Sequence, residues 1–127
     1  MTSKRRVVAA VIEREGRFLL GRRPAGKRHA GLWELPGGKL LPGESALAAA
    51  RRELAEELGV AVVAVGGRLF AAADPGSPFV VEFHRVAIAG EPRALEHDEL
   101  AWAAPAELAG YDLAPSDRAF AAWLLGA

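Results

Sequence analysis

Four glutamates occur within residues 44–57, and their type and spacing suit metal chemistry. An α-helix turns by about 100° per residue, so Glu53, Glu56 and Glu57 share one helical face. Like charges at this spacing repel by roughly 0.2–0.5 kcal/mol per pair, so we expect a cation to compensate them. Clustered carboxylate oxygens are ligands of hard cations, so Mg²⁺ is the expected ion and Mn²⁺ the alternative. Glu44 adds a fourth carboxylate near the helix start, where the dipole favours negative charge.

The same segment carries the start and stop signals of a helix. Ser45 is a good N-cap residue, and Gly59 suits the C′ position that follows a helix end. An apolar stripe with helical spacing lies beside the acidic face and predicts packing against a core; it consists of Leu47, Ala50, Leu54 and Leu58. One side of the predicted helix therefore anchors it, and the adjacent side gathers negative charge.

Two glycines precede this helix. Gly37 and Gly38 directly follow Pro36, so the backbone here can adopt conformations closed to other residues and approach a ligand closely. The alternative interpretation is a solvated helix face whose glutamates pair with Arg51 and Arg52. The glycine turn favours a ligand site over that alternative.

With these residues in place, the chain resembles the Nudix hydrolases. Their signature is Gly-x5-Glu-x7-Arg-Glu-U-x-Glu-Glu-x-Gly-U, where U is aliphatic. Every specified position is matched here, by Gly38, Glu44, Arg52, Glu53, Leu54, Glu56, Glu57, Gly59 and Val60. The resemblance extends to residues 31–39 and 96–117, which are similar to MutT-type members, so it covers nearly the whole chain.

The resemblance implies hydrolysis of a nucleoside diphosphate linked to another group, with metal ions neutralising the pyrophosphate oxygens. By this similarity the metal ligands would be Glu53, Glu56, Glu57 and the carbonyl oxygen of Gly37, and Arg52 would orient a carboxylate. The general base stays open between Glu53 and an acid of residues 96–99, of which Glu99 is our candidate. Plain solvated charge is the alternative for that loop.

Several further residues are candidates for the substrate site. Arg22 or Arg23 could bind a triphosphate through its guanidinium group, although either could also be a surface arginine. Lys39 is a second phosphate candidate, and Glu34 is expected to support the substrate site. Other large or titratable side chains receive no such role: we expect core packing for Trp33 and Trp102, and no metal role for His29, His84 and His97.

Base selection is assigned to residues 113–117, which align with the base-reading segment of MutT-type enzymes. The bacterial type enzyme has Asn where this chain has Asp117. An ionised Asp only accepts hydrogen bonds, which suits the N4 amino group of cytosine. The oxidised guanine of 8-oxo-dGTP remains open as a second base. The competing interpretation is that Asp117 caps the last helix without touching substrate.

Composition agrees with a small enzyme. We expect residues 1–127 to form one domain, because this length supports a single core. The net charge is zero, so polymeric nucleic acid is an unexpected partner, and no apolar run approaches the length of a membrane span. The chain has no cysteine, which fits a reducing compartment, and we expect a cytoplasmic location. A monomer and a homodimer both remain open.

Periodicity predicts an α/β fold, and the resemblance specifies it as an α/β/α sandwich with a mixed β-sheet. Strands are expected at residues 7–12 and 18–21, joined by a turn at residues 15–16. The remaining elements follow the acidic helix: a hairpin of residues 61–70 and 79–88, a strand at 100–103, a short helix at 105–109 and a final helix at 116–125.

Three function classes follow. The first is a magnesium-dependent nucleoside triphosphate pyrophosphohydrolase of MutT type that releases a nucleoside monophosphate and pyrophosphate. It would act on oxidised purine or cytosine nucleotides and clear them from the nucleotide pool. The second is hydrolysis of another substrate such as ADP-ribose, for which Pro75, fifteen residues after Val60, is weak support. The third is a non-catalytic module that senses nucleotides.

Overall fold

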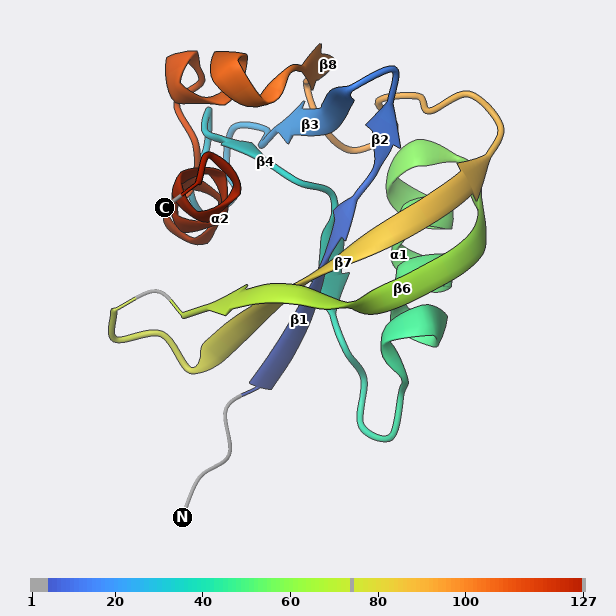
Figure 1. Cartoon of the computed structure of the whole chain (residues 1–127). Coiled ribbons are helices and arrows are strands. Elements are labelled where there is room, and N and C mark those ends of the chain that lie inside the picture. Colours follow the sequence, from blue (N-terminus) through green and yellow to red (C-terminus); the bar gives the residue numbers. More distant parts are fainter. Residues whose placement is uncertain (1–4, 74, 127) are drawn as a thin grey trace.

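The computed structural model describes residues 5–73 and 75–126, whose course is shown in Figure 1. The strands are β1 (Arg5–Val11), β2 (Glu13–Arg14), β3 (Arg17–Arg22), β4 (Trp33–Glu34), β5 (Gly37–Lys39), β6 (Ala61–Ala72), β7 (Phe79–Ala89) and β8 (Glu99–Ala103). The helices are α1 (Ala46–Leu58), the 3-10 helix η1 (Pro105–Gly110) and α2 (Pro115–Leu124).

A mixed sheet with the strand order β5-β1-β7-β6 forms the centre of the molecule. β1 runs parallel to β7, whereas β5 and β6 pair antiparallel with their neighbours. A second sheet is built on β3, which pairs antiparallel with β2, β4 and β8. In this sheet Gly21 lies opposite Glu34 on one side and Leu100 on the other. The second sheet therefore brings the end of β3 next to two segments distant in sequence.

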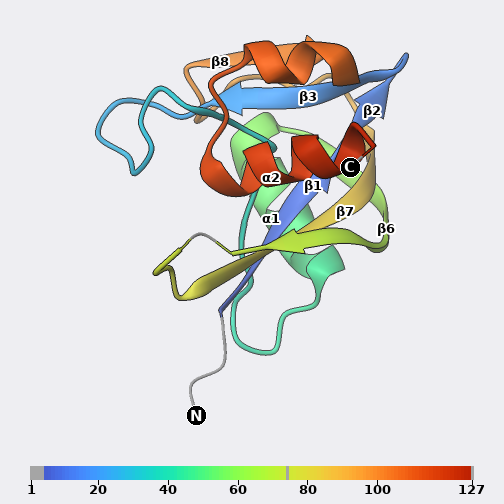
Figure 2. The same cartoon turned by 60° about the vertical axis from the view of Figure 1, so that its left-hand side comes forward.

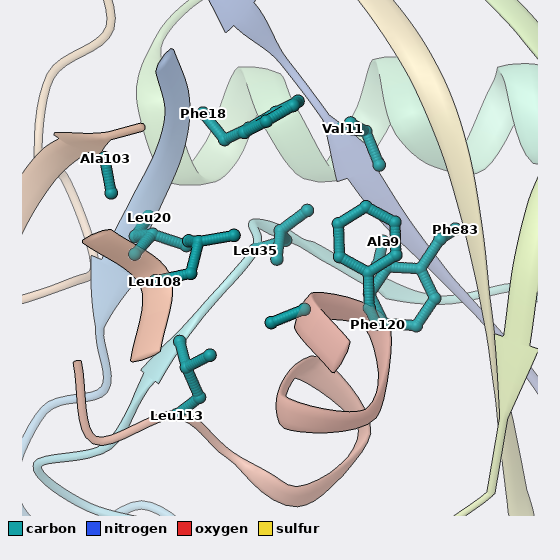
Figure 3. Close-up of a cluster of buried hydrophobic side chains, with 11 residues drawn as sticks. Ala9, Val11, Phe18, Leu20, Leu35, Phe83, Ala103, Leu108, Leu113 and Phe120 are labelled. Carbon is teal, nitrogen blue, oxygen red and sulfur yellow. The ribbon is translucent and has the colours of Figure 1, made fainter. Parts of the chain in front are cut away.

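Helices cover both faces of the mixed sheet, because alternate residues of β1 belong to different cores. Ala9 and Val11 pack in a cluster with Phe83 and with Phe120 of α2, as Figure 3 shows. Ala10 packs in another cluster, with Leu54 of α1. Figure 1 places α2 and α1 on opposite sides of β1, and in the rotated view of Figure 2 α2 lies in front with α1 behind it. The predicted α/β fold with a mixed sheet is confirmed.

Most predicted elements occur within one or two residues of their expected bounds. Glu15 and Gly16 form the tight turn with positive φ values of 53° and 76°. The 61–70 and 79–88 segments form the expected antiparallel hairpin, β6 and β7, and the 105–109 segment forms η1. The sequence pattern did not predict β2, β4 and β5, which are two or three residues long. Within the described ranges, no helix is long and apolar enough to cross a membrane.

Gly37 is the point of closest approach between β5 and β1. It lies opposite Ala9 and has a φ of 153°. A Cβ atom at this position would lie 1.9 Å from the carbonyl oxygen of Val8. Because that contact is with backbone, no side-chain rotation can relieve it. The glycine is therefore needed for β5 to pair with β1.

We predict that Gly37→Ala destabilises the protein by about 1–3 kcal/mol more than Gly43→Ala. Gly43 also has a positive φ, of 76°, but a Cβ there meets nothing within 4 Å, so the control isolates the collision with β1. Urea unfolding of both variants measures the difference. Equal losses of stability would contradict this account of β5.

Candidate active site

Helix α1 presents its three glutamates at different depths. The Ser45 hydroxyl accepts a hydrogen bond from the Ala48 amide at 3.1 Å, and Gly59 ends the helix with a φ of 69°. Both predicted caps are confirmed. Glu57 is only 5% exposed, while Glu53 is half-buried and Glu56 is exposed. The acidic face therefore runs from the protein interior to the surface.

Arg52 holds one of these acids in place. Its guanidinium group donates to Glu53 at 2.6 Å, to both carboxylate oxygens of Glu44 at 2.9 and 3.1 Å, and to the carbonyl oxygen of Lys39 at 3.0 Å. The hydrogen bonds from Arg52, and one from the Leu41 amide, lower the pKa of Glu44. Glu44 thus anchors Arg52, which in turn fixes the Glu53 carboxylate.

Glu57 lies in a strongly acidic environment. Burial raises its pKa to about 9, with further contributions from a hydrogen bond to Glu53 and from the charges of Glu34 and Glu53. The Gly37 amide donates to Glu57 at 3.4 Å and opposes this shift. A Cβ atom at Gly38 would lie 2.3 Å from the carboxyl carbon of Glu53. The two glycines therefore bring the backbone directly against the acids.

Two neighbouring pockets share part of their lining, and one of them contains Glu57. One has a volume of about 360 Å³ and is lined by Glu57 and Gly37, together with Arg23, Pro24, Lys27, Glu34, Glu96 and His97. The other has a volume of about 280 Å³ and its lining includes Leu35, Lys39, Phe79 and Asp117. Arg23, Glu34 and Gly37 line both pockets. The acids are thus continuous with a second, partly apolar space.

The structure separates the two candidate arginines. Arg23 donates to Glu34 at 2.9 Å between the pockets. Arg22 points elsewhere: its guanidinium group lies 3.7 Å from Glu99 and 5.9 Å from the Trp33 ring centroid. Lys39 lines the smaller pocket, with its ammonium group 4.6 Å from the Phe79 ring centroid. Of the pair, Arg23 and not Arg22 lies with the other candidates.

The acids of residues 96–99 also differ in position. Glu99 begins β8, and its carboxylate is 57% exposed beside Arg22, away from the residues that line the two pockets. Glu96 instead lines the pocket that contains Glu57. Our candidate Glu99 therefore does not line the pocket beside the acidic helix, whereas Glu96 does.

For His97 we expected no metal role, and the structure places its ring in the wall of the pocket that contains Glu57. Its side chain is 4% exposed, and Nε2 donates to Glu34 at 2.9 Å and lies 4.0 Å from a Glu57 oxygen. The sequence contained one signal for it: a glycine, Gly21, stands within strand β3 directly after the apolar residues Phe18–Leu20, and a Cβ atom there would lie 2.6 Å from the His97 ring.

Asp117 is buried, 7% exposed, in the wall of the smaller pocket. Its Oδ1 atom accepts a hydrogen bond from the Leu35 amide at 2.9 Å. The cap of α2 is Ala114, which makes no side-chain capping bond, so the alternative that Asp117 is the helix cap is wrong. Asp117 instead connects the first turn of α2 to the segment before β5.

The two tryptophans pack against the cores, as expected. Trp33 makes an edge contact with Tyr111 at a centroid distance of 5.2 Å, and Trp102 packs against the cluster around Leu54.

The donor set at the acidic helix fits a hard divalent cation. Glu53 and Glu57 offer only oxygen atoms, and their mutual repulsion, with that of Glu34, is what a cation would relieve. Among the described residues, no three His, Asp or Glu side chains already converge in the geometry of a metal site. The fit of the ion therefore rests on the chemistry of these donors.

Comparison with known proteins agrees with this site. The model of the NUDIX domain family matches residues 2–124. The chain is 43% identical over 114 residues to a CTP pyrophosphohydrolase of Escherichia coli, covering 87% of this chain and 84% of that protein. It is 44% identical over 119 residues to a putative 8-oxo-dGTP diphosphatase 2 of Mycobacterium tuberculosis, covering 91% and 84%.

Solved structures show the same fold. The crystal structure of a MutT NUDIX hydrolase from Burkholderia pseudomallei matches with a TM-score of 0.81 at 34% identity, covering 93% of this chain and 95% of that one. The sequence signature, the fold and the similar proteins agree on the family. This chain therefore belongs to the Nudix hydrolases of MutT type, enzymes that act on phosphoric anhydride bonds.

Proposed function

We propose that the chain is a magnesium-dependent nucleoside triphosphate pyrophosphohydrolase, with cytosine nucleotides as the leading substrates and 8-oxo-dGTP as the second. It would convert a triphosphate and water into a monophosphate and pyrophosphate. The observation that carries the proposal is the continuity of the two pockets through Arg23, Glu34 and Gly37. A base beside Asp117 would have its phosphates next to Glu57. We take residues 1–127 as one catalytic domain that works in the cytoplasm.

The acids of α1 support the metal assignment. Glu53, Glu56, Glu57 and the Gly37 carbonyl oxygen would hold Mg²⁺, or Mn²⁺ in its place, and Arg52 would keep the Glu53 carboxylate in position. When bound, the ion would neutralise phosphate oxygens and make water a better nucleophile near neutral pH. The chain itself supplies the cradle: a glycine backbone on one side and a helix face on the other.

The remaining residues would bind substrate and move the proton. Glu96 is the proposed general base, because its carboxylate is exposed in the pocket beside Glu57 and could accept a proton from the attacking water. Water would attack one phosphorus of the anhydride between the α- and β-phosphates, the bond from that phosphorus to the bridging oxygen would break, and monophosphate and pyrophosphate would separate. Arg23 and Lys39 would bind the phosphate oxygens as charge-assisted donors.

Asp117 supports the choice of base. A carboxylate accepts hydrogen bonds, and the N4 amino group of cytosine donates them. The similar proteins named a CTP pyrophosphohydrolase and a putative 8-oxo-dGTP diphosphatase support these two nucleotides as the substrates to test. Oxidised guanine also carries N–H donors, but its O6 would need a donor other than an Asp carboxylate. Cytosine is therefore the better match to the wall of the smaller pocket.

We predict that the protein with Mg²⁺ hydrolyses CTP and dCTP to monophosphate and pyrophosphate. A panel of CTP, dCTP, 8-oxo-dGTP, dGTP and ADP-ribose, with products resolved by chromatography, separates the alternatives. Release of AMP and ribose phosphate from ADP-ribose as the main reaction would replace the proposal with the second function class. Binding of nucleotides without turnover would indicate a sensor.

Asp117→Asn tests the base reader without removing its structural bond, because the amide oxygen of Asn can still accept from the Leu35 amide. We predict that the ratio of kcat/KM for dCTP to that for 8-oxo-dGTP falls by about tenfold or more, the worth of one base-specific hydrogen-bonding group. Asp112→Asn, an exposed aspartate beside Arg118, is the matched control. An unchanged ratio would assign Asp117 a purely structural role.

Glu57→Gln tests the metal assignment by stability. The raised pKa means that the folded, metal-free protein binds this proton more tightly than the unfolded chain, so the wild type loses stability as pH rises from about 4.5 toward 9. Glutamine cannot ionise. In EDTA the variant should therefore be more stable than the wild type at pH 8, and this difference in stability should increase by at most about 1.4 kcal/mol for each pH unit.

With Mg²⁺ present, the wild type should instead be more stable than Glu57→Gln. Because a ligand that binds only the folded state stabilises it, Mg²⁺ should raise the melting temperature of the wild type and change that of Glu57→Gln much less. Glu91→Gln, at an exposed ion pair with Arg14, is the control and should respond as the wild type does. Equal pH slopes and equal magnesium effects for Glu57→Gln and wild type would show that Glu57 is no ligand.

A further inference from the structure

His97 sits in a fitted space in the wall of the larger pocket. Its side chain is 4% exposed, and the same pocket is lined by Glu34, Glu57 and Glu96. The space exists because residue 21 is glycine: a Cβ atom at Gly21 would lie 2.6 Å from the Cγ and Cδ2 atoms of the ring. A β-strand loses stability when glycine replaces a larger residue, so the chain forgoes strand stability here for the imidazole.

The His97 ring is connected by hydrogen bonds to a residue that lines both pockets. His97 Nε2 donates to one oxygen of Glu34 at 2.9 Å, and Arg23 donates to the other oxygen at 2.9 Å. The same Nε2 atom lies 4.0 Å from the nearest Glu57 oxygen. One carboxylate therefore joins His97 to an arginine that lines both pockets.

The backbone on either side of His97 is anchored separately. The Leu95 amide donates to the carbonyl oxygen of Glu57 at 3.1 Å, and the Asp98 amide donates to that of Arg22 at 3.0 Å. Glu96 lies between these two points. Its main chain is therefore tied at one end to α1 and at the other to β3, and the buried ring of the next residue is the side-chain attachment between them.

The polar character of His97 has no advantage for packing alone. Within the described part of the chain, its buried Nδ1 atom has no hydrogen-bond partner, which carries a desolvation cost that an apolar side chain would avoid. A leucine could fill much of the same space without that cost. An imidazole at this position is explained if its hydrogen bond to Glu34 fixes the orientation of the side chain, in addition to filling the space.

We propose that His97 is a positioning residue that, seated against Gly21 and bonded to Glu34, holds the Glu96 carboxylate over the acidic end of α1. This inference rests on the proposed function, in which Glu96 is the general base. The imidazole itself takes no proton from water. Its contribution is geometric, and a shift of about 1 Å in a catalytic group can cost around a hundredfold in rate.

Steady-state kinetics of three variants with CTP or 8-oxo-dGTP test the assignment. His97→Leu should lower kcat by about tenfold or more with KM changed by less than about threefold. His97→Gln keeps an N–H donor for Glu34 and should recover most of that loss. His84→Leu is the control, because His84 is an equally buried histidine that bonds to the Gly66 carbonyl oxygen and should leave kcat unchanged.

A double-mutant cycle tests whether Gly21 provides the space that the His97 ring occupies. Gly21→Ala should lower kcat by about tenfold in the wild type, because the new Cβ displaces the ring, and by less than about twofold in a His97→Ala background, where the space is open. Thermal melts of each variant separate unfolding from displacement. Additive effects of Gly21→Ala and His97→Ala, or equal kcat for His97→Leu and wild type, would overturn the proposal.

Amide hydrogen exchange decides the matter independently of turnover. In His97→Leu the Asp98 amide, which bonds to Arg22, should exchange about tenfold faster than in the wild type, whereas His84→Leu should leave it unchanged. Unchanged exchange in His97→Leu would contradict the positioning role even if activity fell. If the wild type hydrolyses none of the nucleotides, the proposed function is refuted. The exchange rate of the Asp98 amide would still show whether His97 positions this segment.

Discussion

Burial of a carboxylate among other carboxylates is the constraint on which the rest of the site depends. Glu57 is 5% exposed and faces the charges of Glu53 and Glu34, which raise its pKa together with burial. Such a group is costly unless cationic or donor groups surround it. Here Arg52, on the same helix, holds Glu53, while Arg23 and His97, from segments outside α1, hold Glu34. The acidic helix thus requires the loop and both sheets around it.

Glycines allow these elements to come close enough. Gly37 lets β5 contact β1 at a distance that no side chain permits, and Gly38 brings the same strand against the Glu53 carboxylate. Gly21 makes room for a buried imidazole on the other side of the acids. At all three positions the missing side chain lets a polar or backbone group take its place. The absence of a side chain at these three glycines therefore shapes the site as much as the acids do.

Local signals in the sequence predicted the parts of the site that local structure determines. Ser45, Gly59 and the spacing of the acids define α1 through contacts within one or two turns, and all three predictions agree with the structure. The choice between Arg22 and Arg23, and between Glu96 and Glu99, depends instead on the pairing of β3 with β4 and β8. Alternation along a strand sends neighbouring side chains to opposite faces, and very short strands such as β4 give no periodic signal.

Contacts between distant segments explain what was missed. The hydrogen bond of His97 to Glu34 spans 63 residues, and that of the Leu35 amide to Asp117 spans 82. Neither the spacing of histidines nor the rules for helix caps indicates such pairs. For this reason the contact of His97 with Glu34 is not predictable from these patterns, and Asp117 has a cap as its alternative interpretation. Gly21, within strand β3, is the one local sign that a large side chain approaches this strand.

The central claim is that the acids of α1 and a nucleotide polyphosphate share a divalent ion. The most direct measurement is an anomalous difference map from crystals grown with Mn²⁺ and a non-hydrolysable CTP analogue. The account predicts a peak between the carboxylates of Glu53 and Glu57 and the phosphate oxygens, with the base beside Asp117. A bound nucleotide with no ion near these carboxylates would contradict it.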